Sequence, residues 1–583
     1  MNIKELTRAL NGKLVGNNYF FSIDGFSGKF TYLTNAHTGD IVIRDWIDEQ
    51  GVLMAFNQNI ACLITPEPRD GAVEMAMRLN FPLIIIDDIE LAKNYAKRNA
   101  KLDSLDDICD LVRAVEGEIV GNDEFFSIDG FSGKFTFLDN AHTGDIVIRH
   151  WIDGTGIQMA FNKNIACLIT QTPKDGAIET AEKLGFPLII TDKIELANAF
   201  ALSYTIKDFS PDSSNVVITG TNGKSTTSHL IYHILNHAGY HVLTNTDSES
   251  EFNTLIDPMV SELISTEVEK NGKLDFLVIE VSEVQGWLGK LMKHHAALMT
   301  KAIRPDVGVI TNIAMDHIGL VNSIDDVFNE IKRVPQSVGK GVTVLNHDDE
   351  LVMNLNAKNP FYTSMSQLDE DNAVYFNGSA IIYKDDEILT VNELPFTGNH
   401  FIQNILSAIA ACISLSIEMD KITEGVKTYK ALNRRFALLH DKPAIYDDFA
   451  HNPEGIKATI TETIKLLPQN QKLHIACAIR GSRGVDINQL NVDAIVESMD
   501  DNIELYLTSS KDVVNDLNFV EDNEREVFFD TLNKNNIKFV HFDNLKDCLS
   551  EVYHNADEND VILLIGAQGM DPAESLLEDI IKI

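Results

Sequence analysis

Short runs of apolar, β-branched residues alternate along this chain with longer stretches whose apolar positions recur at helical spacing. Apolar runs that are bounded by polar or glycine-containing turns are typical of buried strands. They predict strands at residues 216–219, 241–244, 274–280, 307–312, 444–448, 473–479 and 561–565. Helical patterns lie between them, at residues 228–235 and 405–412 among others. This alternation favours doubly wound sheets, in which parallel strands carry helices on both faces.

A tandem repeat occupies the first third of the chain. Residues 12–100 recur at residues 117–205, and the segment Ser22–Thr31 returns unchanged as Ser127–Thr136. The first copy has strand patterns near residues 41–43, 62–64 and 82–86, with a helix pattern at 71–79. A strand, a helix and a strand in that order predict a small α/β unit with parallel pairing. A repeat of this length indicates duplication of one domain rather than a solenoid.

The strand at 216–219 leads into the segment Gly220-Thr-Asn-Gly-Lys-Ser-Thr226 and then into a helix. The N–H groups of such a loop and the N-terminus of the helix cradle phosphate oxygens. Lys224 would reach the β- and γ-phosphates of ATP, and the hydroxyl of Ser225 or Thr226 would lie near Mg²⁺. The usual pattern begins with a glycine where this chain has Ile218. An ordinary glycine turn is therefore the alternative to an ATP site.

Polar residues also follow the neighbouring strands. The strand at 274–280 ends in Glu280, which we expect to hold Mg²⁺, with Glu283 as the second choice. Asp316 and His317 follow the strand at 307–312 and are expected at the same edge of the sheet. Lys332 comes on a helix that starts near residue 323, where a lone lysine is normally a solvated charge.

The second half of the chain offers further polar clusters. Gly398, His400 and Asn404 stand at the start of a helix and either bind a nucleotide or cap a buried helix. The strand at 444–448 leads into Asp448-Phe-Ala-His-Asn-Pro453, a concentrated polar cluster at a strand-to-helix junction. The arginine-bearing turn at residues 480–484 could meet ATP bound by the preceding domain.

These patterns predict an α/β protein of several domains, because 583 residues exceed the roughly 100–200 of one domain. We expect two tandem small α/β domains at residues 1–104 and 105–208. A central P-loop doubly wound ATPase domain would cover residues 209–430. A C-terminal Rossmann-like α/β domain would cover residues 431–583.

Each repeat carries candidate binding groups. The loop Ser22–Lys29 is glycine-rich and holds a lysine, so it either binds a phosphate or forms a plain β-turn. His37 and His142 are equivalent loop residues, which are more often structural than catalytic. Arg44 and Arg149 follow strands, where either could pair with a diphosphate. The sequence leaves open which copy binds substrate.

Composition narrows the classes of function. The formal net charge of −39 disfavours nucleic acid and anionic membrane surfaces as partners, so basic residues must act locally at any phosphate site. The six cysteines form no Cys-x-x-Cys pair, which favours buried thiols in a reducing compartment. The first residues begin a helix pattern rather than a signal peptide, and no apolar run approaches a membrane span. We therefore expect a cytoplasmic protein.

Taken in order, these motifs resemble the Mur ligases, which couple ATP hydrolysis to amide-bond formation on a carboxylated acceptor. The matching pieces span about residues 210–583: Gly220–Thr226, Glu280-Val-Ser, Thr311–His317, Gly398-Asn-His400 with Asn404, Arg435, and Asp448–Pro453. Departures are Phe401, where the family usually has Asn, and Phe449, where it has Tyr. The Asp-Asn-Pro-Arg segment of diaminopimelate-adding members is absent near residues 508–511.

The resemblance implies a role for each matching residue. Residues Gly220, Thr221, Asn222, Gly223, Lys224, Ser225 and Thr226 would bind the ATP phosphates. Ser225, Glu280 and His317 would hold Mg²⁺, and Lys224, His317 and Lys332 would be catalytic, with Lys332 carried as a carbamate. Asn404, Arg435, Asp448 and His451 would contact the nucleotide or close the C-terminal domain over it.

The implied activity is ATP-dependent ligation through an acyl phosphate. The repeats are loosely similar to uridine-nucleotide-binding domains of the family, with Thr38-Gly-Asp40 in place of Pro-Gly-Asp. The chain is most similar to archaeal pseudomurein peptide ligases, so the partners would be ATP, an amino acid and a UDP-linked peptide acceptor. The alternatives are a ligase or cyclase acting on a tetrapyrrole, polyglutamate or cyanophycin-like carboxylate, and a nucleotide-sensing regulator built on a decayed ligase.

Overall fold

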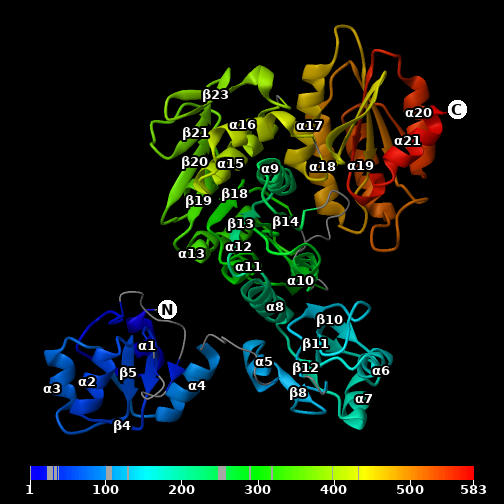
Figure 1. Cartoon of the computed structure of the whole chain (residues 1–583). Helices are drawn as coiled ribbons and strands as arrows, with labels where there is room; N and C mark the ends of the chain where they lie inside the picture. The colour runs from blue at the N-terminus through cyan, green and yellow to red at the C-terminus, as the bar shows by residue number, and fades with distance from the viewer. Residues whose placement is uncertain are drawn as a thin grey trace. The chain divides into compact units, whose positions relative to one another are not determined.

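The computed structural model describes residues 2–22, 30–31, 36, 38–99, 108–127, 130–246, 258–287, 290–316, 320–396, 398–430 and 432–582. The chain divides into two compact units. One comprises residues 1–132 and 138–197, and the other comprises residues 133–137 and 198–583. The first contains most of the tandem repeat, and the second contains the motif-bearing remainder (Figure 1).

The first repeat is a small α/β unit, as its pattern predicts. Its strands β7, β5 and β3 pair in parallel, and β1 joins β7 in the antiparallel sense. Its elements are α1 (Ile3–Ala9), β1 (Lys13–Val15), β2 (Phe30–Thr31), β3 (Ile41–Ile43), β4 (Trp46–Ile47), α2 (Glu49–Asn57), β5 (Cys62–Thr65), β6 (Glu67–Pro68), α3 (Ala72–Arg78), β7 (Leu83–Ile85) and α4 (Ile89–Asn99).

The second repeat has the same order of strands, with β12, β11 and β10 parallel and β8 antiparallel to β12. Equivalent residues therefore have equivalent places: Leu63 pairs with Leu83 in one copy, and Leu168 with Leu188 in the other. Its elements are α5 (Ile108–Ala114), β8 (Glu118–Val120), β9 (Phe135–Thr136), β10 (Ile146–Ile152), α6 (Gly154–Asn162), β11 (Cys167–Pro173), α7 (Ala177–Leu184), β12 (Leu188–Ile190) and α8 (Ile194–Phe209).

The glycine-rich loop is described chiefly in the second copy. There Ser132 donates from its backbone N–H to Gly144 at 2.7 Å and from Oγ to Asp145 at 2.6 Å, which makes a tight turn. The side chain of His142 is 88% exposed. In the first copy, residues 23–29 and His37 lie outside the described residues.

The central domain is built on nine strands in the order β14-β15-β13-β18-β19-β20-β21-β22-β23. Strands β14 to β21 are parallel, and β22 and β23 complete the sheet as antiparallel hairpins. The strands are β13 (Ser214–Thr219), β14 (Val242–Thr244), β15 (Phe276–Glu280), β18 (Val307–Ile310), β19 (Val342–Asn346), β20 (Pro360–Ser364), β21 (Ala373–Phe376), β22 (Ala380–Tyr383) and β23 (Asp386–Thr390), with a separate ribbon of β16 (Gly286–Trp287) and β17 (Lys290–Leu291).

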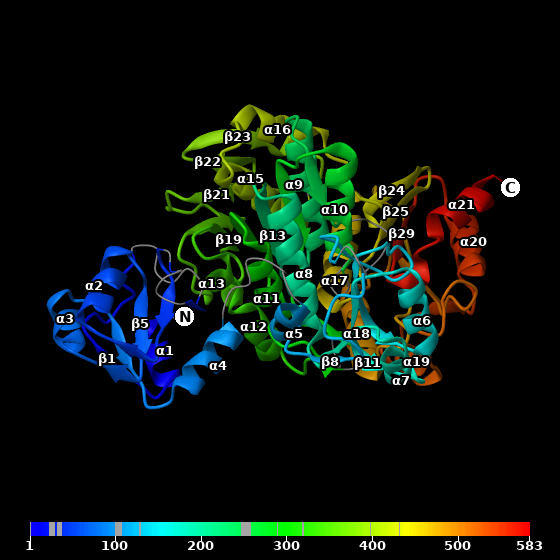
Figure 2. The same cartoon turned by 60° about the horizontal axis from the view of Figure 1, so that its bottom comes forward.

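Helices cover both faces of this sheet, which confirms the doubly wound prediction (Figures 1 and 2). One face packs on α9 (Lys224–His237), α15 (Asn399–Ser414) and α16 (Met419–Thr428). The other packs on α8, α10 (Met259–Asn271), α11 (His295–Ile303), α12 (Ile324–Ile331) and α13 (Val334–Val338), and a short helix α14 (Glu350–Met353) follows β19. Helices α9 and α15 lie side by side, so the phosphate-loop helix is part of the hydrophobic core.

The C-terminal domain is a second doubly wound sheet with the strand order β24-β25-β29-β26-β27-β28. All neighbours pair in parallel except β24 and β25. The elements are β24 (Arg435–Asp441), β25 (Ala444–Asp448), α17 (Pro453–Leu466), β26 (Leu473–Ala478), α18 (Val485–Ser498), β27 (Ile503–Thr508), α19 (Asp522–Lys534), β28 (Phe539–Phe542), α20 (Leu545–Asn555), β29 (Val561–Ile565) and α21 (Ala573–Ile581). All six cysteines of the chain are thiols, and five are buried.

The buried face of α15 tests the packing of the central domain. Ile409 is fully buried there, so replacing it with alanine should lower the free energy of unfolding by about 2–5 kcal/mol. Ile464→Ala, at a side chain that is 39% exposed in α17, should change it by less than about 1 kcal/mol. Urea-induced unfolding measures both, and equal effects of the two substitutions would contradict this packing.

Candidate active site

The candidate site begins where β13 ends. Gly220, with φ +123°, leaves the strand, and Gly223, with φ +80°, caps the N-terminus of α9. A Cβ atom on Gly220 would lie 2.3 Å from Oγ1 of Thr311, and one on Gly223 would lie 2.2 Å from Oδ1 of Asn404. Both positions therefore require glycine, because the loop turns tightly and neighbouring strands and helices pack directly against it.

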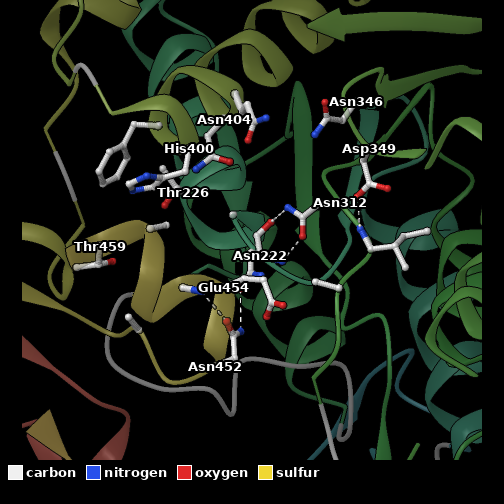
Figure 3. A pocket seen from close by; sticks show the side chains of 18 of the residues that line it. Asn222, Thr226, Asn312, Asn346, Asp349, His400, Asn404, Asn452, Glu454 and Thr459 are labelled. Carbon is white, nitrogen blue, oxygen red and sulfur yellow. Dashed lines mark hydrogen bonds between the residues drawn. The ribbon is translucent and has the colours of Figure 1, made fainter. Parts of the chain in front are cut away.

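Side chains and backbone from the end of β18 hold this loop. The backbone N–H of Asn222 donates to Oδ1 of Asn312 at 2.9 Å, and Nδ2 of Asn312 donates to the Asn222 carbonyl at 2.8 Å (Figure 3). Thr221 donates from its N–H to the Asn312 carbonyl at 2.9 Å and accepts at Oγ1 from the N–H of Ala314. The phosphate-loop candidate is thus held by the segment that follows β18.

Lys224, the first residue of α9, lies beside acidic side chains, and its own side chain is 15% exposed. Its Nζ donates to the carbonyls of Gly220 and Thr221 at 2.8 and 2.9 Å and to Oε2 of Glu283 at 2.8 Å. Burial alone would lower the pKa of Lys224, but the carboxylates of Glu283, Glu280 and Asp316 raise it above its usual value. Lys224 is therefore a permanent cation at neutral pH, and Glu283 is its direct ion-pair partner.

Glu280 ends β15 next to the start of α9. Its Oε1 accepts from Oγ of Ser225 at 3.3 Å, and its Oε2 accepts from Oγ1 of Thr246 at 3.3 Å. Nη2 of Arg435, from the C-terminal domain, donates to the same Ser225 hydroxyl at 3.2 Å. A carboxylate beside a loop hydroxyl suits Mg²⁺, which typically takes one or two carboxylates together with substrate phosphates and water. The described residues contain no group of three or more His, Cys, Asp or Glu side chains placed to hold a metal by themselves.

A cavity of about 560 Å³ lies between the central and C-terminal domains of this unit. Asn404 and His400 of α15 line one side of the cavity (Figure 3). Burial lowers the pKa of His400, so its imidazole is neutral at pH 7. The cavity brings together most of the predicted nucleotide residues: Asn222, Gly223, Thr226, Asn404, Arg435, Asp448 and His451.

The C-terminal domain contributes to the cavity through β24 and the segment after β25. The guanidinium groups of Arg434 and Arg435 each lie 4.9 Å from the ring centre of Phe449. Oδ1 of Asp448 accepts from the N–H of Ala450 and from Oγ1 of Thr459, which fixes the carboxylate at the cavity wall. His451 is held through its carbonyl, which accepts from Nδ2 of Asn491 at 3.0 Å.

Two predicted residues are not part of this arrangement. Lys332 ends α12 as an exposed side chain whose Nζ donates to Oδ1 of Asn329 at 2.5 Å, and it does not line the cavity. His317, predicted as a catalytic residue and a metal ligand, lies outside the described residues. The structure leaves both roles as predictions.

Two asparagines have a larger place in the site than the sequence indicates. Asn312 binds the backbone of the phosphate loop, and Asn452 reaches the loop from the C-terminal domain. Both follow a strand within a predicted motif, at residues 311–317 and 448–453. Their amides carry no charge and have no diagnostic spacing, so only the position after a strand could have indicated them.

Sequence profiles agree with this division of the chain. The profile of the Mur ligase middle domain matches residues 218–412, and that of the Mur ligase glutamate ligase domain matches residues 434–568. The chain belongs to the Mur ligase family. Members of this family are ATP-dependent amide ligases, and this protein is an enzyme of that class.

Individual relatives are distant. The ligase is 28% identical to a UDP-N-acetylmuramate–L-alanine ligase of Clostridium acetobutylicum over 60% of this chain and 73% of that protein. The crystal structure of MurF from Acinetobacter baumannii has a TM-score of 0.58 at 15% identity, covering 81% of this chain and 98% of that one. A pseudomurein peptide ligase type C from Methanothermus fervidus has a TM-score of 0.51 at 18% identity, covering 92% and 100%. These two likenesses establish the fold.

Within the part of the ligase that the structure describes, no helix is both long and apolar enough to cross a bilayer.

The buried pair of Lys224 and Glu283 makes a testable contribution to stability. The side chain of Glu283 is only 1% exposed, so Lys224→Met leaves a buried carboxylate without its cation and should cost about 3–5 kcal/mol. Lys224→Met combined with Glu283→Gln should recover most of that loss, because the side chain at position 283 is then no longer charged.

Lys457→Met is the matched control for this pair. Lys457 and Glu497 form an ion pair of 2.5 Å in which both side chains are about half exposed or more, so its loss should cost less than about 1 kcal/mol. Denaturant titration compares the variants. If the Lys224→Met protein were as stable as the wild type, Glu283 would not depend on Lys224 for neutralisation of its charge.

Proposed function

We propose that this Mur ligase uses ATP to join an amino acid to a carboxylated cell-wall peptide precursor. The main support is the shared cavity, which the loop residues Asn222, Gly223 and Thr226 of one domain line together with Arg435 and Asp448 of the other. The sequence relative from Clostridium acetobutylicum carries the name of a ligase acting on a UDP-linked sugar acid. We propose a UDP-linked acceptor of the pseudomurein type, with the N-terminal repeats as the domains that bind it.

The chemistry would proceed in two transfers. An acceptor carboxylate oxygen bonds to the γ-phosphorus of ATP while the bond from that phosphorus to ADP breaks. The amine of the amino acid then attacks the acyl carbon, inorganic phosphate leaves, and the nitrogen loses a proton to give the amide. Phosphoryl transfer of this kind needs positioning and charge stabilisation more than covalent catalysis.

The cavity residues and the predicted residues of the phosphate loop and the neighbouring strands would divide this work. Lys224 and the amides of residues 220–226 would bind the phosphates, and Arg435 would add positive charge from the C-terminal side. Ser225, Glu280 and His317 would hold Mg²⁺, which neutralises charge on the phosphates when it is bound. Asn404, Asp448 and His451 would orient the nucleoside. The binding site would therefore be complete only when the central and C-terminal domains are closed on each other.

Phosphate release tests the proposed reaction. Release from ATP should require both an acceptor and an amino acid when UDP-linked peptides and single amino acids are screened in combination. The double variant Lys224→Met with Glu283→Gln removes both charges of the ion pair together. It should lose more than about 99% of this activity, because the ammonium group that would bind the phosphates is gone. Amide formation by that variant at the wild-type rate, or phosphate release that is independent of any acceptor, would contradict the proposal.

We also propose that Lys332 carries a carbamate. Its exposed amine is accessible to dissolved carbon dioxide, and a carbamate would replace its positive charge with a negative one. Lys332→Ala should then lose activity and regain part of it when a short carboxylic acid such as acetate is added. Lys301→Ala, which removes an exposed lysine from the neighbouring helix α11, should show neither effect. Equal stimulation of both variants by acetate would overturn the carbamate.

A further inference from the structure

One side chain of the C-terminal domain contacts the phosphate loop directly. Asn452 caps the N-terminus of α17, where its Oδ1 accepts from the N–H of Gly455 at 2.9 Å. Its Nδ2 donates to Oδ1 of Asn222 at 2.8 Å, and Figure 3 shows the two amides facing each other. Asn452 is 2% exposed. A single buried amide thus starts a helix in one domain and binds the loop of another.

The partner of this contact is already fixed on its other side. Asn312 takes both backbone groups of Asn222, the N–H at 2.9 Å and the carbonyl at 2.8 Å. Only the side chain of Asn222 extends toward the C-terminal domain. The peptide of Asn222 is therefore clamped by β18, and the direction of its side chain is set by Asn452.

Charged groups reinforce the same boundary. Asp316, a buried carboxylate of the central domain, lies 3.5 Å from Nη1 of Arg480 and 3.6 Å from Nε2 of His451. Nδ2 of Asn452 is 3.5 Å from the same carboxylate. These contacts hold the segment before α17 against the central domain, so Asn452 meets Asn222 only when the two domains are in this arrangement.

We propose that Asn452 is a positioning residue that transmits the placement of the C-terminal domain to the phosphate loop. When the domains close, its amide orders the peptide at Asn222, and the loop amides are held in the geometry that phosphate binding needs. When the domains separate, the loop keeps Asn312 and loses this second clamp. The inference rests on the proposed use of this loop for ATP, but its structural part applies to the protein without nucleotide.

Hydrogen exchange of the ligand-free protein tests the structural part. Asn452→Ser keeps a good helix cap, but the serine hydroxyl is too short to reach Asn222. Amide exchange in a peptide covering residues 219–224 should become about two- to tenfold faster. The loss of one neutral hydrogen bond changes the equilibrium between closed and open states by about this factor. The control is Asn544→Ser, the same substitution at the residue that precedes α20 in the same domain, where the side chain donates to Asp547 instead of capping the helix. It should leave exchange in the loop unchanged.

Unchanged loop exchange in Asn452→Ser, with an unchanged melting temperature, would overturn the proposal. A helix-capping role alone would change exchange in α17 and not in the loop, some 230 residues away in sequence. Faster exchange in the loop alone, or in the loop and α17 together, supports the transmission.

A double-mutant cycle on ADP affinity tests the functional part. Asn222→Ala and Asn452→Ser should each weaken ADP binding about two- to tenfold in isothermal titration calorimetry. The double variant should bind ADP no more weakly than whichever single variant has the lower affinity, because each substitution removes the same contact between Asn222 and Asn452. Additive losses would overturn the coupling. A wild-type protein that fails to bind ADP would instead refute the proposed function, and the exchange result would still decide the loop contact.

Discussion

Parallel pairing in the central sheet is the constraint on which the site depends. The register places Ile218 of β13 opposite Glu280 of β15, and Thr219 opposite Ile310 of β18. Since parallel strands end at one edge, the phosphate loop, the carboxylate of Glu280 and the amide of Asn312 must emerge together. A shift of one residue in either pairing would turn these groups toward the opposite face of the sheet. The observed register thereby sets which groups meet at this edge.

Charge balance shapes how this edge can receive a phosphate. In a chain with a net charge of −39, three basic groups in and around the site are already paired with carboxylates: Lys224 with Glu283, Arg434 with Asp447, and Arg480 with Asp316. Lys224 donates to three acceptors, which is the number of protons that an ammonium group carries. Binding a phosphate through Lys224 therefore requires this side chain to exchange one of its partners. Such an exchange favours ligands that bring several negative charges at once.

The sequence predicts this fold well because its signals are local. The strands at 216–219, 444–448 and 561–565 are found as β13, β25 and β29, and the helix after the phosphate loop is found as α9. The strands β19–β23 were not predicted; they are as long as β15 and β18, which were predicted, but they carry no motif. The repeat was equally visible, and the paired strands of both copies follow its offset.

The site itself was predicted less completely, for physical reasons. Glu280 and Glu283 have similar spacing from the loop, and only the folded geometry separates a carboxylate beside Ser225 from one that neutralises Lys224. The roles of Asn312 and Asn452 depend on contacts between segments 90 and 230 residues apart. Periodicity reports which side of an element is buried, and it says nothing about which distant backbone an amide will meet.

The turn at Arg434 shows how two identical neighbours acquire different partners. Arg434 has a φ of +56°, a conformation that costs a residue other than glycine roughly 1–3 kcal/mol. Its guanidinium is buried among Asp447, Asp571 and the carbonyl groups of Gly566 and Ala567, which holds the turn in place. Because the backbone reverses there, Arg435 extends the other way and reaches Ser225. The bonds that hold Arg434 therefore also fix where Arg435 begins. The rigidity of this turn limits how far the Arg435 guanidinium can move relative to the phosphate loop of the central domain.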